Sequence, residues 1–173
     1  MTEISFRRLI SIDSPAYRTI RLECLKNFPQ YFGTSYDEQV VLPKLAWEAF
    51  IESADPNHFT VGAFDGDTLI GICSFNRDGR GKVKHIGEIV QMYVKPEYAG
   101  QKVGLRLIQA MIAEAFSDEG IEQLLLNVVT TNISANRVYE EAGFVEYGIL
   151  KNNFKHNGEY SDQRMMVLFS EGR

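Results

Sequence analysis

The spacing of apolar residues changes along the chain, and each change predicts a different kind of element. Between Ser14 and Pro29 apolar residues recur every three or four positions, which predicts an amphipathic helix with Ser14 as its N-cap. A second helix is expected between Pro43 and Asp55, where turn residues bound another periodic run. The loop over residues 28–36, between these two helices, is rich in aromatic side chains.

Short apolar runs bounded by turn signals predict strands elsewhere in the chain. The tripeptide Asp65-Gly66-Asp67 and the dipeptide Asn157-Gly158 are typical of hairpin turns. The run 124–129 has too many consecutive apolar residues for a half-exposed strand, so we expect it to be buried on both faces. Strands are therefore expected at residues 4–9, 59–64, 69–75, 86–94, 124–129, 144–150 and 163–169.

Two further stretches have helical periodicity, at residues 105–116 and 134–142, and the glycine after the second is placed to cap it. The order of elements predicts an α+β (mixed α/β) fold in a single domain over residues 1–173. Its centre would be a twisted, mostly antiparallel sheet of six or seven strands, flanked by helices. One parallel strand–helix–strand crossover is expected in the second half of the chain.

Composition narrows the classes of partner. The chain carries 18 Lys and Arg against 23 Asp and Glu, a net charge of -5, which argues against nucleic-acid and anionic-membrane partners and mildly favours a cationic small substrate. A modest negative charge is also common on soluble proteins. Cys24 and Cys73 lie far apart without metal-ligand spacing, so no metal site is expected. No long apolar run and no apolar leader is found, which predicts a cytoplasmic location.

The stretch from Glu88 to Gly104 reads as a strand, an exit marked by Pro96, a turn with glycine at position 100, and a helix start. The first N–H groups of a helix have no intrahelical partner and the helix dipole is positive there, so phosphate binds readily. A plain connection between strand and helix explains the same glycines equally well. Neither a Walker A motif nor a Rossmann glycine motif is present.

A second segment favours the phosphate interpretation. It matches the signature Asn-x-x-Ala-x-x-x-Tyr-x-x-x-Gly-Phe in full, at Asn132, Ala135, Tyr139, Gly143 and Phe144. With the preceding turn, it resembles the GCN5-related N-acetyltransferase (GNAT) family, whose acetyl-CoA turn, Gln/Arg-x-x-Gly-x-Gly/Ala, falls on residues 99–104. The resemblance follows the order of elements from end to end and implies the GNAT fold.

Two positions depart from the family pattern. Ala99 stands where the family usually has Gln or Arg, and Lys102 stands where it usually has Gly. Lys102 either points away from the backbone cradle or adds its charge to a phosphate, and the sequence leaves both open.

The resemblance implies acetyl-CoA as cosubstrate and a set of residues that bind it. These are Met92, Tyr93, Val94, Ala99, Gly100, Gln101, Lys102, Val103, Gly104, Asn132 and Ala135. Asn132 would also serve as the N-cap of the helix that follows it.

The resemblance also implies two catalytic residues. Glu88 matches a general base, acting directly or through water, and Tyr139 matches the general acid toward the coenzyme A sulfur. Strand alternation would place Glu88 on the same face as Val90, Met92 and Val94, partly removed from water. The alternative for Glu88 is a glutamate at the edge of the sheet that faces water. The alternative for Tyr139 is a core tyrosine with an exposed tip.

The aromatic loop supplies candidates for the acceptor pocket, although a small hydrophobic cluster explains it equally well. These residues are Tyr31, Phe32 and Tyr36. The three histidines are expected to be surface residues, since they form no cluster along the sequence: His58, His85 and His156.

The function expected from the resemblance is transfer of acetyl from acetyl-CoA to a primary amine, by direct attack in a ternary complex. One alternative is a protein N-terminal or lysine acetyltransferase, and another is a non-catalytic acyl-CoA-binding sensor. The acceptor stays open among amino acids, polyamines, aminoglycosides and peptide amines, because specificity lies in loops. A homodimer is compatible with family habit, and neither nucleic acid nor membrane is expected as a partner.

Overall fold

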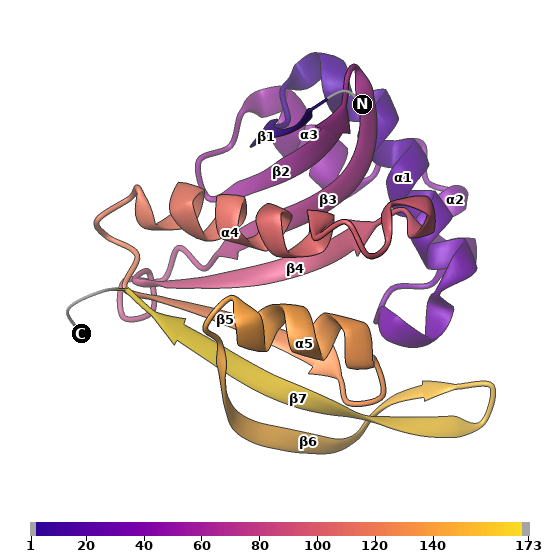
Figure 1. Ribbon diagram of the computed structural model, residues 1–173, viewed down its shortest axis with the longest axis vertical. Helices are drawn as coiled ribbons and strands as arrows, with labels where there is room; N and C mark the ends of the chain where they lie inside the picture. Colours follow the sequence, from indigo (N-terminus) through magenta and orange to yellow (C-terminus); the bar gives the residue numbers. More distant parts are fainter. Residues whose placement is uncertain (1–2, 171–173) are drawn as a thin grey trace.

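The computed structural model describes residues 3–170, and its centre is one seven-stranded sheet (Figure 1). The strand order is β1-β2-β3-β4-β5-β7-β6, and every neighbouring pair is antiparallel except β4 and β5. The strands are β1 (Ile4–Arg8), β2 (His58–Asp65), β3 (Thr68–Arg77), β4 (Ile86–Val94), β5 (Gln123–Val129), β6 (Val145–His156) and β7 (Glu159–Phe169). The predicted mixed sheet with one parallel crossover is confirmed.

Helices cover both faces of the sheet (Figure 1). One buried cluster lies between the sheet and α4 and α5, and the other lies between the sheet and α1 and α3. The helices are α1 (Ser14–Asn27), α2 (Tyr36–Val40), α3 (Ala46–Ser53), α4 (Val103–Phe116) and α5 (Ile133–Glu141). The short α2 was not expected from the sequence; it begins at the last residue of the aromatic loop, and Ser35 caps it by accepting from the backbone N–H of Glu38.

Strands β4 and β5 pair over only four residues, from Ile86 opposite Gln123 to Ile89 opposite Leu126. Beyond that point the two strands separate, as Figure 1 shows between β4 and the β5–β7 layer. β3 continues to pair with the other edge of β4 as far as Val94. The far half of β4 therefore keeps one edge without a strand partner in the described sheet, which leaves backbone N–H and C=O groups free for another extended chain.

A bulge in β4 changes which face its side chains occupy. Opposite β3 the register slips between Val90 and Tyr93, and Gln91 has a positive φ of 58°. The Tyr17 hydroxyl of α1 donates to Gln91 Oε1 at 2.7 Å. Ile89 before the bulge and Met92 after it both pack against the α4 cluster. The expected single face for Glu88 and Met92 is therefore wrong, because the extra residue inverts the alternation.

The expectation that residues 124–129 are buried on both faces is also wrong at two positions, since Leu125 is only half-buried. Leu124, Leu126 and Val128 are buried, but Asn127 is exposed. Asn127 follows the last residue of β5 that pairs with β4, so the separation of the two strands uncovers it. Its side chain can therefore line a cavity beside the two strands.

The closing hairpin is longer than the sequence indicated. β6 and β7 run up to a two-residue turn at Asn157 and Gly158, whose φ values of 50° and 84° match the left-handed geometry that such turns require. Within the described residues, no helix is long and apolar enough to cross a membrane.

Candidate active site

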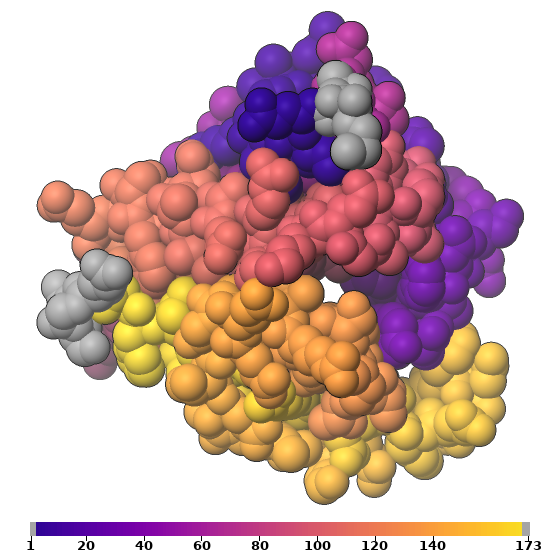
Figure 2. All heavy atoms as spheres, in the orientation of Figure 1, coloured from indigo at the N-terminus to yellow at the C-terminus, as the bar shows by residue number. Residues whose placement is uncertain are grey.

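Two cavities open where β4 and β5 separate. One has a volume of about 470 Å³ and lies along α4, α5 and the end of β4; we call it the cofactor groove. The other, of about 540 Å³, lies toward α1 and α3, and we call it the acceptor cleft. Tyr31 and Phe32 line both, so the cavities meet at these rings. Figure 2 shows a hollow at this place, bordered by α4, α5 and the purple N-terminal segment.

The glycine-bearing turn forms one end of the cofactor groove. Gly100 has a φ of 76°, and a Cβ added there would meet nothing within 4 Å. A Cβ on Gly104 would also approach nothing closer than 3.7 Å. The first backbone bond of α4 runs from the N–H of Arg106 to the carbonyl of Lys102, so the three N–H groups before it have no acceptor in the helix. An open turn that ends in free N–H groups fits a phosphate.

Lys102 occupies a backbone conformation that suits glycine, with a φ of 57° immediately before α4. This explains why a glycine is usual at the matching position of the family pattern, since a side chain in the left-handed region costs about 1–2 kcal/mol. The backbone of the turn nevertheless has the left-handed conformation that a glycine would adopt at this position. Lys102 is exposed and lines the cofactor groove.

We expect the substitution Lys102→Gly to weaken acetyl-CoA binding by up to about fivefold, as for loss of one exposed ion pair. Its effect should shrink as salt is raised, because salt screens exposed charges. The unfolding temperature of the free protein should not fall, since glycine adopts this φ without strain. Calorimetric titration with acetyl-CoA at two salt concentrations measures the effect. The variant Lys102→Asn is the matched control, because asparagine tolerates the left-handed region and is also uncharged; unchanged affinity in both would show that the ammonium does not reach the cofactor.

Tyr139 lies on α5, is 8% exposed as a residue, and lines the cofactor groove. The ring packs edge-on against Phe144, with ring centroids 6.2 Å apart. Its hydroxyl has no hydrogen-bond partner in the described chain and is not fully enclosed, so it opens into the groove. Burial raises the pKa of Tyr139 well above its ordinary value, so the phenol keeps its proton at neutral pH.

The α5 segment that carries Tyr139 is fixed by side-chain bonds at its start. The Asn132 Oδ1 accepts from the N–H of Ala135 at 3.3 Å, which is the predicted N-cap. The buried Asn136 donates to the carbonyls of Val129 and Asn132, and it accepts from Arg164 of β7. Together these contacts hold the first turn of α5 to the end of β5.

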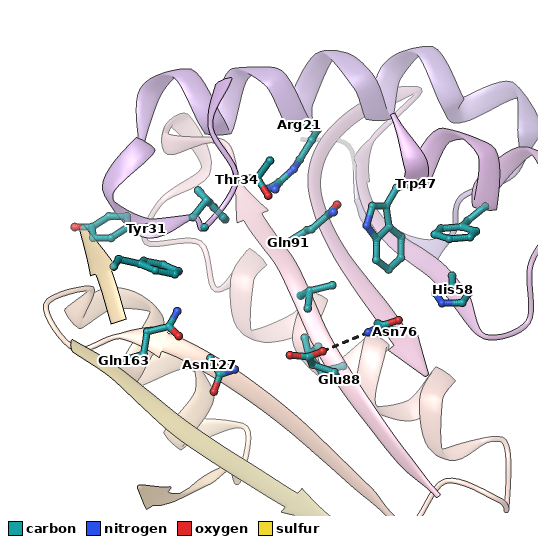
Figure 3. Close-up of a pocket in the computed structure, with 16 residues that line it drawn as sticks. Arg21, Tyr31, Thr34, Trp47, His58, Asn76, Glu88, Gln91, Asn127 and Gln163 are labelled. Atoms are coloured by element: carbon teal, nitrogen blue, oxygen red, sulfur yellow. Dashed lines mark hydrogen bonds between the residues drawn. The ribbon is translucent and has the colours of Figure 1, made fainter. Parts of the chain in front are cut away.

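Glu88 lies in the acceptor cleft, on the opposite face of the sheet from the α4 cluster (Figure 3). Asn76 of β3 donates to Glu88 Oε2 at 3.3 Å, the dashed line in Figure 3. Asn127 and Gln163 face the same space from β5 and β7. Glu88 is the only acidic residue among those that line the cleft.

Aromatic rings form the far wall of the acceptor cleft. His58 stacks on Phe50 at 4.2 Å between ring centroids, and Trp47 meets both rings edge-on. Asp55 holds the imidazole in place, with its Oδ1 3.1 Å from His58 Nδ1. His58 was expected to be a surface residue, but it is half-buried and lines the cleft. The signal that could have found it is its position eight residues after Phe50, across the turn from α3 to β2.

The structure brings most of the predicted site residues together. The cofactor groove is lined by Met92, Tyr93, Val94, Ala99, Gly100, Lys102, Val103, Gly104, Asn132, Ala135 and Tyr139. Gln101 does not line it, and its side chain donates to the carbonyl of Glu97. Tyr36 lines neither cavity; it packs at the edge of the α1 cluster, with the Lys26 ammonium 5.8 Å from its ring.

Known proteins resemble this chain in sequence and in fold. The chain is 35% identical over 82 residues to a spermidine N(1)-acetyltransferase from Vibrio cholerae, and the match covers 47% of each protein. The chain thus spans about half the length of this relative. A crystal structure of an acetyltransferase of the GNAT family from Streptococcus pneumoniae superposes with a TM-score of 0.86 at 23% identity, over 97% of this chain and 100% of that one.

A ribosomal L7/L12 alpha-N-protein acetyltransferase solved with coenzyme A has the same fold, with a TM-score of 0.76 at 17% identity, over 100% of this chain and 97% of that one. The model of the acetyltransferase (GNAT) family matches residues 15–144, from α1 to the residue after the glycine that caps α5. That range contains the whole glycine turn, Glu88 and Tyr139. This chain belongs to the acetyltransferase (GNAT) family.

Proposed function

We propose that this protein transfers an acetyl group from acetyl-CoA to a primary amine by direct attack in a ternary complex. The observation that carries the proposal is the meeting of two cavities at Tyr31 and Phe32. One cavity ends in a turn suited to phosphate and contains a buried phenol, and the other contains a carboxylate. Family membership and structural neighbours solved with coenzyme A support the same assignment.

The cofactor groove fits acetyl-CoA, which supplies an acetyl group as a thioester. The unpaired edge of β4 from Met92 to Val94 would bind the pantetheine amides as an added strand does. The free N–H groups at the start of α4 would bind the pyrophosphate. Both contacts use backbone atoms, so the changes at Ala99 and Lys102 leave them in place.

Glu88 and Tyr139 would divide the proton transfers between the two cavities. Glu88, in the acceptor cleft, would take a proton from the ammonium form of the acceptor, directly or through water, so that a neutral amine bonds to the acetyl carbon. Tyr139, in the cofactor groove, would donate its phenolic hydrogen to the sulfur as the carbon–sulfur bond breaks. The proton that the bonded nitrogen then loses would restore the phenol of Tyr139. The products are the acetamide and the thiol form of coenzyme A.

The two cysteines do not suit an acyl-enzyme route. Cys24 and Cys73 are both 0% exposed, and neither lines a cavity. Burial raises the pKa of the Cys24 thiol to about 11, so almost none is thiolate at neutral pH. Because the thiolate is the nucleophile, neither residue is placed to carry acetyl.

A screen of amines that follows coenzyme A release tests the proposal. We expect at least one amine to be acetylated with kcat on the order of 1 s⁻¹ or more. Double-reciprocal plots at several acetyl-CoA concentrations should intersect, as a ternary complex requires; parallel lines would contradict direct attack. Tight acetyl-CoA binding without transfer to any amine, peptide N-termini and lysine included, would instead establish a non-catalytic sensor.

A further inference from the structure

Arg21 of α1 is a buried cation that has no anionic partner among residues 3–170. The residue is 4% exposed and lines the acceptor cleft. The only hydrogen bond of its guanidinium in the described chain is a contact of 3.5 Å from Nη1 to Cys24 Sγ, a weak acceptor. The Phe32 ring centroid lies 5.1 Å from its guanidinium carbon. A guanidinium offers five N–H donors, so most of them have no partner.

The carboxylates near α1 are already engaged elsewhere. Glu48 is bound by Arg18, at 2.9 Å, and by the backbone N–H of Leu45. Glu23 pairs with Lys95 at 3.1 Å and accepts from the Tyr93 hydroxyl. None of the carboxylates in the described part of the chain forms an ion pair with Arg21. A buried charge left in this state is costly unless something else binds it.

The unused donors of Arg21 face the cleft. None of its nitrogens is both fully enclosed and without a partner, so the donors that lack a protein acceptor are those with access to open space. Figure 3 shows the side chain descending from α1 toward Thr34 and Gln91, above the strand that carries Glu88. The cleft therefore presents a guanidinium on its helix side and a carboxylate on its strand side.

We propose that the amine acceptor is a free amino acid, whose carboxylate binds Arg21 while its amine faces Glu88. The inference rests on the proposed function and names the substrate class of the same site. A zwitterion supplies the anion that Arg21 lacks and the nitrogen that the reaction needs. The ring wall of Trp47 and Phe50 favours an apolar or aromatic side chain on that amino acid.

The charges of Arg21 and Glu88 disfavour polyamines and peptide N-termini as acceptors. A polyamine would bring several ammonium groups to a cleft whose only acidic lining residue is Glu88 and would place one of them near Arg21. A peptide has an amide where an amino acid has its carboxylate, so it would leave Arg21 unpaired. The acceptor predicted here thus differs in charge from spermidine, the substrate named for the Vibrio cholerae relative.

The test compares the twenty amino acids with their carboxamides, their decarboxylated amines and spermidine. We expect the best amino acid to exceed its own carboxamide about 10- to 100-fold in kcat/KM, as for loss of a charge-assisted pair. In Arg21→Met this ratio should fall to about 1, chiefly through KM. Arg21→Lys should keep part of it, and the exposed Arg80→Met, the matched control, should keep all of it.

The unfolding temperature of Arg21→Met distinguishes a binding role for Arg21 from a structural one. Because Arg21→Met removes an unpaired buried charge and keeps an unbranched apolar chain, its unfolding temperature without ligand should not fall. A large fall, with the preference for carboxylates unchanged in the refolded variant, would make Arg21 a structural residue and overturn the inference.

Calorimetric titration of the amino acids into protein loaded with coenzyme A gives a readout independent of turnover. Binding that is lost in Arg21→Met supports the inference even if no amine is acetylated, a result that would sink the proposed function alone. Acetylation of carboxamides or spermidine as well as or better than amino acids would leave the proposed function standing and overturn the inference. Failure of every amino acid to bind would overturn it as well.

Discussion

Replacing Tyr139 by Phe is expected to lower kcat for acetyl transfer about 100-fold, the usual loss when a general acid is removed. Acetyl-CoA affinity should stay within about threefold, because the ring keeps its contacts and only the hydroxyl is lost. The fold should be unaffected, since that hydroxyl has no hydrogen-bond partner in the described chain. Stopped assays of coenzyme A release and a calorimetric titration measure the two quantities.

The raised pKa of Tyr139 sets the pH dependence of this effect. Burial disfavours the phenolate, so the proton stays on through the neutral range and is lost only above the ordinary tyrosine pKa of about 10. The loss in Tyr139→Phe should therefore be the same from about pH 6 to pH 9. Tyr160→Phe, at an exposed tyrosine of β7, is the matched control. Equal turnover in the two variants would remove Tyr139 from the acid role.

Local signals made the cofactor groove predictable. Caps and turns depend on a few adjacent residues, and the structure has Asn132 as N-cap, Gly143 with a φ of 98° after α5, and Gly100 in the left-handed region. Lys102 follows the same rule, because its backbone has the left-handed conformation that a glycine would adopt. Such positions can be read from sequence because the backbone requirement is local.

The acceptor cleft was much less predictable, because its features arise from contacts between distant segments. The bulge at Gln91 inverts the alternation of β4, and its side chain accepts from Tyr17, 74 residues earlier. Asn127 is exposed only because β5 leaves β4 after four paired residues. The spacing of apolar residues in the sequence predicts neither the bulge nor the separation of β5 from β4.

Arg21 illustrates a further limit of sequence reasoning. An arginine within an amphipathic helix is ordinarily assigned to the solvent face, and its helical spacing gave no reason to single it out. Its significance lies in the missing ion pair, and a missing partner is visible only once the neighbours are in place. Neither Glu23 nor Glu48 supplies that partner, because Glu23 pairs with Lys95 and Glu48 pairs with Arg18.

Replacing Glu88 by Gln is expected to lower kcat/KM for the amine about 100-fold near pH 6.5, with a smaller loss at high pH. At low pH nearly all of the acceptor is ammonium, so the reaction depends on a group that takes its proton. Free α-amino groups titrate near pH 8 and alkylamines near pH 10, so above these values the neutral amine forms in solution. The ratio of kcat/KM between the unsubstituted protein and Glu88→Gln should therefore fall to less than about tenfold by pH 10.

The geometry makes this substitution a clean probe. Asn76 donates to Glu88 Oε2, and the amide oxygen of glutamine accepts the same bond, so the neighbouring strand keeps its contact. Glu119→Gln, at an exposed position beyond α4, is the matched control for loss of one negative charge and should leave the pH profile unchanged. A Glu88→Gln loss that is equal at every pH would assign Glu88 to positioning the acceptor rather than to proton transfer. Because Glu88 is the only acidic residue lining the cleft, no second lining carboxylate stands ready to replace it. A loss that narrows with pH therefore identifies Glu88 itself as the base.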